Sequence, residues 1–330
     1  MKKVVGLTYD LRKDYLAEGF TEEQAGEFDS EETINCLQQT IEKLGYKTER
    51  IGNAKALCGQ LAAGRRWDMV FNIAEGFGGR NRESQVPCML ELYEIPYTFS
   101  DPLSCAITLD KALAKKIVQS AGIPTSNFFV IEKIQDIKKT DLQFPLFIKP
   151  IAEGTGKGVD ADSLVEKPEN LKKTCKYLLE KFKQPLLAEE FLSGREFTVA
   201  VLGNASNAKT LGIMEIEIPG DPKGIYSFTA KEKCEQLVNY KPYRDKALYD
   251  RLSKLAVESY HALQCRDAAR VDFRCDKNGE PNFLEINPLP GLHPTHSDLP
   301  MIAAQEGMSY QDLIKSIIDN ALARTKRPVD

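Results

Sequence analysis

The segment AARVDFRCDKNGEPNFLEINPLPG, residues 268–291, holds the pattern that decides the fold. Polar and apolar residues alternate on both sides of Asn278-Gly279, a dipeptide that favours a tight hairpin turn because both residues tolerate positive φ. A two-residue turn at that point sets the facing pairs of the two strands. The predicted pairs are Lys277 with Glu280, Asp272 with Glu285, and Arg270 with Asn287.

The alternation gives this hairpin one polar and one apolar face, because successive side chains of a strand point to opposite sides. The polar face carries Arg270, Asp272, Glu285 and Asn287, and the apolar face carries Val271, Phe273, Leu284 and Ile286. Two directly opposed carboxylates repel, unless a cation lies between them. Carboxylate and amide oxygens suit Mg²⁺ or Mn²⁺ beside a nucleotide phosphate. The sequence therefore predicts Asp272, Glu285 and Asn287 as metal ligands, and the alternative is a solvated face neutralised by Arg270.

Length and composition are those of a soluble globular protein of two or three lobes, with 330 residues, 42% hydrophobic and 28% charged. A net charge of −4 argues against a protein that binds nucleic acid through bulk basic charge. The apolar run in the opening segment is too short for a signal peptide or a membrane span, so we expect a cytoplasmic protein without a membrane partner. Eight scattered cysteines without a CxxC pair indicate reduced thiols in preference to disulfides or zinc.

Strands and helices alternate over the first hundred residues. Short apolar runs at 3–9, 46–52 and 67–73 predict strands, and an apolar stripe from Ser30 to Leu44 predicts a helix with Ser30 as N-cap. This alternation is typical of a Rossmann-like parallel sheet. Such sheets bind ligands beyond the carboxyl ends of their strands, and residues 75–79 follow one such end.

The rest of the chain also mixes helices and strands, and it contains no repeat or Pro-rich linker, so we expect lobes that pack together. A single long helix is predicted from about Ser104 to Ser120. The other predicted helices are 168–182, about 245–263 and 309–322, and the other strands are 127–132, 144–150, 185–192 and 195–204.

The segment EGTGKGV, residues 153–159, can cover phosphates with its backbone N–H groups. It is not a Walker A loop, because Lys157 is followed by Gly158, and a flexible turn is the alternative. In LLAEEFLSGREFTV, Glu189 and Glu190 end one predicted strand and Glu196 begins the next. The alternative to a binding role for these three acids is a solvated connection between the strands.

Seven short motifs occur in one order and resemble the ATP-grasp superfamily, with the D-alanine–D-alanine ligase family as the closest match, from about residue 60 to 322. The motifs are Leu109-Asp110-Lys111, Ile148-Lys149-Pro150, Glu153-Gly154-Thr155, Glu189-Glu190-Phe191-Leu192, Gly194-Arg195-Glu196-Phe197-Thr198, Arg270-Val271-Asp272 and Leu284-Glu285-Ile286-Asn287. The resemblance implies an α/β fold of three lobes: a Rossmann-like lobe (1–102), a central ATP-grasp lobe (103–190) and a C-terminal ATP-grasp lobe (191–330).

The resemblance further implies that ATP lies between the second and third lobes, with one role for each matching residue. Lys111 and Lys149 contact phosphates and the surroundings of the adenine. Glu189 and the backbone around Glu190 and Leu192 hold the adenine edge, and Glu196 binds the ribose hydroxyls. Thr155 lies near the γ-phosphate, Lys231 belongs to a segment that closes over the phosphates, and Asp272, Glu285 and Asn287 bind Mg²⁺ (or Mn²⁺).

The implied reaction is the ATP-dependent joining of a carboxylate to an amine through an acyl phosphate. Arg270, on the metal face, would stabilise the oxyanion of the tetrahedral intermediate. Small amino acids or peptides are the expected substrates, and family analogy suggests a homodimer.

The substrate-facing loops depart from that family. Glu75-Gly76 stands where the family has His-Gly, so we expect this stretch to form a substrate wall, and Glu27 is the candidate for the substrate amine, with a solvated acidic loop as its alternative. Gly291 and Ser297 are candidates to receive a carboxylate. His293 and His296 would form a second metal site only with a third ligand. The functional alternatives are a ligase for another amino acid or peptide pair, an ATP-binding protein without catalysis, and a phosphotransferase.

Overall fold

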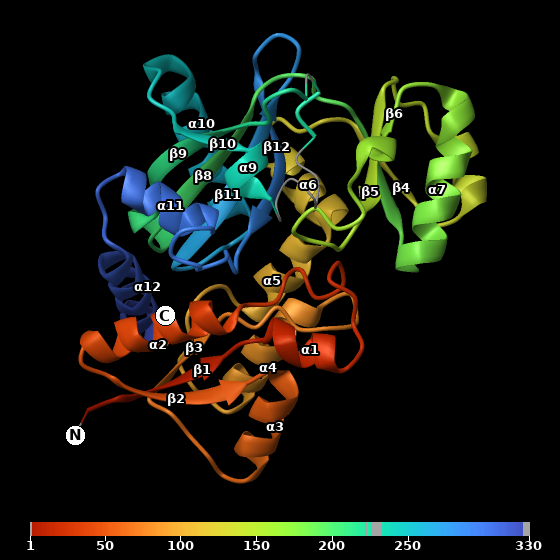
Figure 1. The fold of residues 1–330 in the computed structure, drawn as a ribbon. Coiled ribbons are helices and arrows are strands. Elements are labelled where there is room, and N and C mark those ends of the chain that lie inside the picture. The colour runs from red at the N-terminus through yellow and green to blue at the C-terminus, as the bar shows by residue number, and fades with distance from the viewer. Residues whose placement is uncertain (1, 222, 226–232, 326–330) are drawn as a thin grey trace.

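The computed structural model describes residues 2–221, 223–225 and 233–325. The described residues form three separate sheets, and each lies in its own lobe (Figure 1). A parallel sheet lies at the bottom of the view, a five-stranded sheet at the upper left and a four-stranded sheet at the right. Helices α5 (Pro102–Leu109) and α6 (Lys111–Ser120) run upward between them.

The first lobe has the parallel sheet that the sequence predicts, in the order β2-β1-β3. Its elements are β1 (Val4–Thr8), α1 (Arg12–Ala17), α2 (Glu31–Lys43), β2 (Lys47–Gly52), α3 (Ala54–Ala62), β3 (Met69–Asn72) and α4 (Gln85–Leu92). Helix α2 begins as predicted, since the Ser30 hydroxyl accepts a hydrogen bond from the Thr33 amide at 3.1 Å.

The single helix predicted for 104–120 is wrong, because the structure has two helices, α5 (Pro102–Leu109) and α6 (Lys111–Ser120). Asp110 lies between them in an extended conformation and caps α6 through the Leu113 amide at 3.0 Å. The Lys111 amide donates to the Ile151 carbonyl, 3.1 Å away, in place of a bond within the helix. The break therefore turns α6 and fixes Lys111 beside the central lobe.

The central lobe is a four-stranded antiparallel sheet in the order β4-β7-β5-β6, with α7 packed on it. Its elements are β4 (Phe128–Ile131), β5 (Leu146–Pro150), β6 (Leu164–Val165), α7 (Pro168–Phe182) and β7 (Leu186–Glu190). Leu171, Cys175 and Leu178 of α7 are buried against Ile148 and Ala188 of the sheet.

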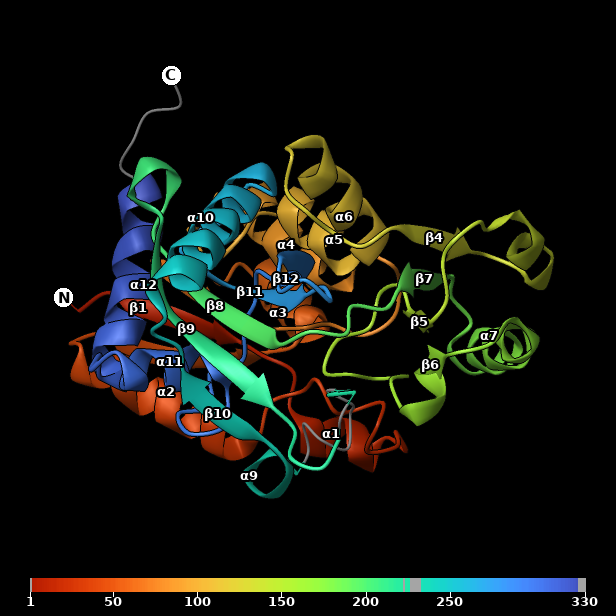
Figure 2. The ribbon, with the colours of Figure 1, turned by 90° about the horizontal axis from the view of Figure 1, so that it is seen from above.

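The C-terminal lobe is a five-stranded antiparallel sheet in the order β10-β9-β8-β11-β12, with α10 over one face (Figure 2). Its elements are β8 (Glu196–Leu202), β9 (Lys209–Glu217), α9 (Cys234–Leu237), β10 (Asn239–Pro242), α10 (Lys246–Ala262), β11 (Ala268–Cys275), β12 (Pro281–Asn287), α11 (Asp298–Gln305) and α12 (Tyr310–Thr325). Helix α12 packs its Leu313 and Ile317 into one core with Ile34 and Leu37 of α2. Within the described ranges, no helix is both long and apolar enough to cross a membrane.

Candidate active site

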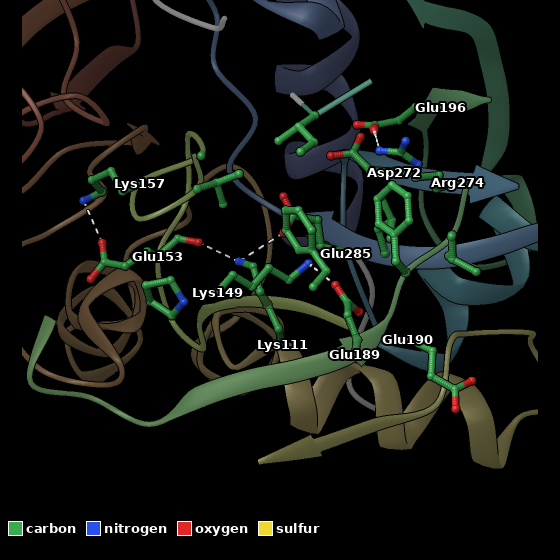
Figure 3. A pocket seen from close by; sticks show the side chains of 18 residues that line it. Lys111, Lys149, Glu153, Lys157, Glu189, Glu190, Glu196, Asp272, Arg274 and Glu285 are labelled. Atoms are coloured by element: carbon green, nitrogen blue, oxygen red, sulfur yellow. Dashed lines mark hydrogen bonds and ion pairs between the residues drawn. The ribbon is translucent and has the colours of Figure 1, made fainter. Parts of the chain in front are cut away.

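A cleft opens between the β5–β7 side of the central sheet and the β11–β12 hairpin, with about 810 Å³ of empty space when the solvent at its mouth is included (Figure 3). Its walls bring together side chains from both lobes and from α6. The charged residues among them are Lys111, Lys149, Glu153, Lys157, Glu189, Glu190, Glu196, Asp272, Arg274 and Glu285. Most of the residues that the sequence predicted to bind the nucleotide or the metal therefore line this one cleft.

Two buried lysines hold the carboxylate of Glu189. Lys149 Nζ lies 2.7 Å from Oε1, and Lys115 Nζ lies 2.9 Å from Oε2. Burial alone would raise the pKa of Glu189, but the two ammonium groups outweigh it and hold that pKa at about 2. Burial lowers the pKa of Lys115, which is fully enclosed. Glu189 is therefore a fixed anion that orients Lys149 at the cleft.

Lys111 joins the two sides of the cleft. Its Nζ lies 3.0 Å from the Glu285 carboxylate on β12 and donates to the Glu153 carbonyl at 2.6 Å (Figure 3). The cation thus stands between a candidate metal ligand and the glycine-rich loop, where a transferred phosphoryl group would need positive charge.

The hairpin pairs Asp272 with Glu285 and Arg270 with Asn287, as predicted. The predicted two-residue turn is wrong, however, because Asp276 and Glu280 close a three-residue loop with Gly279 at φ 86°. The register shifts by one residue between Asp272 and Phe273, which leaves an extra residue, Leu284, on β12. This bulge restores the predicted pairing beyond it.

The bulge also corrects the predicted apolar face. Phe283, and not Leu284, faces Phe273 and enters the buried core. Leu284 instead lines the cleft beside Glu285. An apolar side chain therefore forms part of the surface on which a nucleotide base or sugar would rest.

The candidate metal ligands are held by neighbours in the sheet. Thr198 donates to Asp272 Oδ1 at 2.7 Å, and Arg270 Nη2 lies 3.4 Å from Asp272 Oδ2. With its amide oxygen turned toward Arg270, Asn287 accepts from Nε at 3.2 Å. Arg270 also donates to Asp298 at the start of α11.

This donor set fits a hard divalent cation that shares its coordination with phosphates. Asp272, Glu285 and Asn287 offer only oxygen ligands. In the described ranges no three acidic, His or Cys side chains are grouped closely enough for a complete protein cage. Such an open set leaves positions for substrate oxygens, as Mg²⁺ sites of nucleotide-using enzymes do.

The adenine and ribose candidates lie at the far end of the cleft. The Glu190 side chain points away from the cleft, accepting from Asn127 at 2.9 Å and from the Gln143 amide at 2.9 Å, so only its backbone faces the cleft (Figure 3). Leu192 lines the cleft. Glu196 also lines it and accepts from Arg274 at 3.2 Å.

The glycine-rich loop is anchored to the first lobe by Glu27. The Gly154 amide donates to Glu27 Oε1 and Lys157 Nζ lies near Oε2, both at 2.6 Å, and Arg82 contacts both oxygens at 3.1 Å. Burial would raise the pKa of Glu27, yet Arg82 and Lys157 lower it. Thr155 is partly buried in this loop, with φ 50°.

Glu75 and Gly76 follow β3, at the carboxyl edge of the parallel sheet. Gly76 has φ 71°, and a Cβ there would meet the Arg82 carbonyl at 2.7 Å, so the close turn requires glycine. Burial, followed by repulsion from Glu83 and Glu27, raises the pKa of Glu75. Within the described ranges the Glu75 carboxylate has no hydrogen-bond partner.

The acceptor-side candidates lie in the loop between β12 and α11. The Ser297 hydroxyl accepts from the His293 amide at 2.9 Å, and Gly291 approaches so closely that a Cβ would lie 2.7 Å from that hydroxyl. The rings of His293 and His296 lie 4.5 Å apart. Lys231, expected to close over the phosphates, lies outside the described residues.

Sequence reasoning did not identify Lys115 or Arg274. Both were detectable by periodicity, because Lys115 lies one helical turn after Lys111, and Arg274 shares the strand face of Arg270 and Asp272.

Known proteins resemble this chain over most of its length. The family profile described as D-ala D-ala ligase C-terminus matches residues 117–319. The chain is 37% identical over 264 residues to the uncharacterised protein y4sG of Sinorhizobium fredii, covering 78% of this chain and 75% of that protein. It is 33% identical over 287 residues to a D-alanine–D-alanine ligase of Aquifex aeolicus, covering 87% and 93%.

Solved structures share the fold. A D-alanine–D-alanine ligase of Bacillus anthracis, complexed with ATP, superposes with a TM-score of 0.73 at 24% identity, covering 98% of this chain and 99% of that one. The VanG D-Ala:D-Ser ligase of Enterococcus faecalis superposes with a TM-score of 0.74 at 23% identity, covering 97% and 100%.

Proposed function

The chain belongs to the D-alanine–D-alanine ligase family and is an ATP-dependent ligase that forms carbon–nitrogen bonds, and we propose that it joins two small amino-acid substrates through an acyl phosphate in the cleft described above. The observation that carries this proposal is the meeting of Lys111 and Lys149 with Asp272 and Glu285 on opposite walls of that cleft. We also propose the lobe boundaries 1–102, 103–190 and 191–330, and a homodimer.

In the first step a substrate carboxylate oxygen attacks the γ-phosphorus of ATP, and the bond from that phosphorus to the β–γ bridging oxygen breaks to release ADP. This transfer needs positioning and neutralised charge more than covalent help. Lys111 and Lys149 neutralise phosphate oxygens, with Thr155 and Lys231 as further candidates near the γ-phosphate. Asp272, Glu285 and Asn287 would hold Mg²⁺ (or Mn²⁺), which supplies charge neutralisation when bound.

In the second step the amine nitrogen attacks the acyl carbon, and the carbon–oxygen bond to phosphate then breaks, giving the amide and inorganic phosphate. The substrate ammonium group first loses one proton to solvent water to become a nucleophile, and the attacking nitrogen loses a second proton to the departing phosphate. Arg270 stabilises the oxyanion of the tetrahedral intermediate. Gly291 and Ser297 receive the carboxylate of the second substrate through the backbone and the hydroxyl.

The nucleotide lies with its adenine edge at the backbone of Glu190 and Leu192 and its ribose at Glu196. For Glu189 we replace the role at the adenine edge that the resemblance implies, because its carboxylate already pairs with Lys149 and Lys115, and we propose that it acts by holding these two lysines. This assignment is supported by the cleft position of these groups and by the Glu190 side chain pointing away from it.

A specific observation favours substrates other than two alanines. Glu75, Glu83 and Asp29 lack side-chain hydrogen-bond partners within the described ranges, while the nearby Arg82 is engaged by Glu27 and the Ala152 carbonyl. Glu83 is buried, Glu75 and Asp29 are partly buried, and acids without a partner in such a setting favour a bound cation. We therefore propose that the first substrate carries an ammonium group on its side chain, with Glu75 and Gly76 forming its wall.

The test combines ATP turnover with product mass. Purified protein, Mg-ATP and single or paired amino acids are assayed for ADP and phosphate, hydroxylamine traps the acyl phosphate as a hydroxamate, and mass spectrometry identifies the amide. The panel includes D-alanine, D-serine, and both enantiomers of ornithine and lysine with norvaline and norleucine as matched neutral analogues. Binding of Mg-ATP without amino-acid-stimulated turnover would instead indicate a non-catalytic protein, and a stable phosphorylated product a phosphotransferase.

A further inference from the structure

Arg274 lies on β11 two residues beyond Asp272 and is 8% exposed. Its guanidinium group reaches the part of the cleft that we assign to the nucleotide sugar (Figure 3). Nη1 donates to Glu196 Oε2 at 3.2 Å. The two side chains are close because Arg274 of β11 lies directly opposite Glu196 of β8 in the sheet. Arg274 therefore sets the orientation of the acid assigned to the ribose hydroxyls.

The same guanidinium group holds a stretch of backbone at the edge of the cleft. Nη1 also donates to the Gly224 carbonyl at 2.8 Å, and Nη2 donates to the Lys223 carbonyl. Ile225, the next residue, lines the cleft. Lys223 Nζ in turn lies 2.6 Å from Glu166 of the central lobe. Residues 223–225 thus link the two lobes beside the proposed nucleotide site, and Arg274 holds the carbonyls of Lys223 and Gly224.

A third contact completes this arrangement. The Arg274 guanidinium carbon lies 4.9 Å from the centre of the Phe191 ring, which also lines the cleft. Nε is buried and has no hydrogen-bond partner within the described ranges. Burying a charged group with a donor left unsatisfied is unfavourable, so a role in packing alone would be served better by an apolar residue. The contacts of Arg274 belong to the cleft and its edge.

We propose that Arg274 is a positioning residue that couples recognition of the nucleotide sugar to the ordering of residues 223–225. The hydroxyls of the bound sugar donate to the Glu196 carboxylate and fix its position. Arg274 donates to the same carboxylate. Because one rigid, planar group serves both Glu196 and the two carbonyls, a change at one set of contacts is transmitted to the other. This inference rests on the proposed placement of ATP in the cleft.

The test measures nucleotide binding without turnover. Calorimetry compares the β,γ-imido analogue of ATP with its 2′-deoxy and 3′-deoxy forms, each with Mg²⁺, for wild-type protein and the R274M and R274K variants. We expect the wild type to bind the ribonucleotide about tenfold or more tightly than either deoxy form, the equivalent of one hydrogen bond to a charged group. R274M should reduce this ratio to less than about threefold, and R274K should restore it only in part, because an ammonium group lacks the planar fork.

R195M is the matched control. Arg195 neighbours Glu196 in the chain, but it pairs with Glu215 and contacts the rings of Phe197 and Tyr243, away from the cleft lining. The ratio between nucleotides should be unchanged in this variant. Urea unfolding of all variants shows whether a loss of binding reflects a loss of folded protein.

Hydrogen exchange supplies a second readout. Nucleotide binding should slow amide exchange in residues 223–225 of the wild type, less so with the deoxy forms, and not in R274M. A structural role alone would weaken all nucleotides by one factor and leave both the ratio and the protection intact, which would overturn the inference. Failure of the wild type to bind any nucleotide would overturn the proposed function as well.

Discussion

Glu27 of the first lobe and Lys157 of the glycine-rich loop form a buried ion pair, with 2.6 Å between Oε2 and Nζ. The two residues are 130 positions apart in the chain, and the pair fixes the loop that we assign to the ATP phosphates. The acid expected to meet a substrate amine is therefore also the anchor of the phosphate loop. Substrate binding near Glu27 and phosphate binding near Lys157 act on the same pair.

Replacing Glu27 by Gln should destabilise the protein and weaken ATP binding. The change leaves Arg82 and Lys157 buried beside a neutral amide, and breaking a buried ion pair costs about 3–5 kcal/mol. Urea unfolding and the KM for ATP measure the two effects. E23Q is the control, because Glu23 pairs with Lys181 at a more exposed position, where such a pair contributes about 0.2–1 kcal/mol. Equal losses in both variants would contradict an anchoring role for Glu27.

Replacing Lys115 by Met should destabilise the fold far more than the same change at Lys116. Lys115 is fully buried and donates to Thr125 and the Phe283 carbonyl while pairing with Glu189, whereas Lys116 is exposed. We expect a loss of about 3–5 kcal/mol in the free energy of unfolding for K115M, and less than about 0.5 kcal/mol for K116M. A K115M protein as stable as the wild type would show that Lys149 alone is enough to balance the buried charge of Glu189.

Replacing Asp272 by Asn should abolish metal-dependent turnover with little effect on folding. Loss of charge stabilisation by several kcal/mol lowers kcat by about 100-fold or more, at 1.36 kcal/mol per tenfold. ADP formation measures turnover, and the electron paramagnetic resonance of Mn²⁺ measures metal binding in the presence of nucleotide. E280Q, at the exposed tip of the same hairpin, should behave as wild type. Unaltered Mn²⁺ binding in D272N would remove Asp272 from the metal site.

The pH dependence of stability should reveal the carboxylates of the first lobe. Burial, together with repulsion from Asp10, raises the pKa of Asp29 to about 8, and burial is the main cause that raises the pKa of Glu83 to about 7. An acid with a raised pKa contributes stability below its unfolded pKa, and this contribution is lost as the pH rises through the folded pKa. The wild type should thus lose stability between about pH 4 and 8, and D29N should lose less. Chemical unfolding at several pH values measures both slopes, and parallel slopes would contradict the assignment.

The same groups predict the pH dependence of substrate use. If the first substrate carries a side-chain ammonium group, its binding improves as Glu83 and Asp29 ionise, so kcat/KM for that substrate should rise through pH 7 to 8. The neutral analogue norleucine or norvaline should lack this rise. An identical profile for both would show that the substrate ammonium group does not meet these acids.

The sequence predicted the parallel sheet, most strands and many of the residues that line the cleft, because these follow from local periodicity and short motifs. The pairing of Asp272 with Glu285 was predicted correctly although the turn was not. The three-residue turn shifts the register by one residue and the bulge at Leu284 shifts it back. Neither the turn length nor the bulge leaves a periodic pattern in the sequence. The predicted pairing was therefore correct only beyond the bulge, where the two shifts cancel.

The break at Asp110 shows a different reason for failure. Asp110 is a good N-cap, but the competing bond from the Lys111 amide to the Ile151 carbonyl is a tertiary contact, which helical periodicity does not record. The partners of Glu27 were likewise unpredictable, because Arg82 and Lys157 are brought to it from distant positions by the packing of the lobes.

Because α12 packs against α2, the first lobe can complete its folding only after α12 has been synthesised. Leu313 and Ile317 complete a core begun by Val5 and Ile34, so the first lobe synthesised lacks part of its interior until nearly the whole chain has left the ribosome. Until then its apolar surface is exposed to chaperones and to other nascent chains. A fragment that ends before α12 should accumulate as aggregate, even though it retains the described residues of the nucleotide cleft.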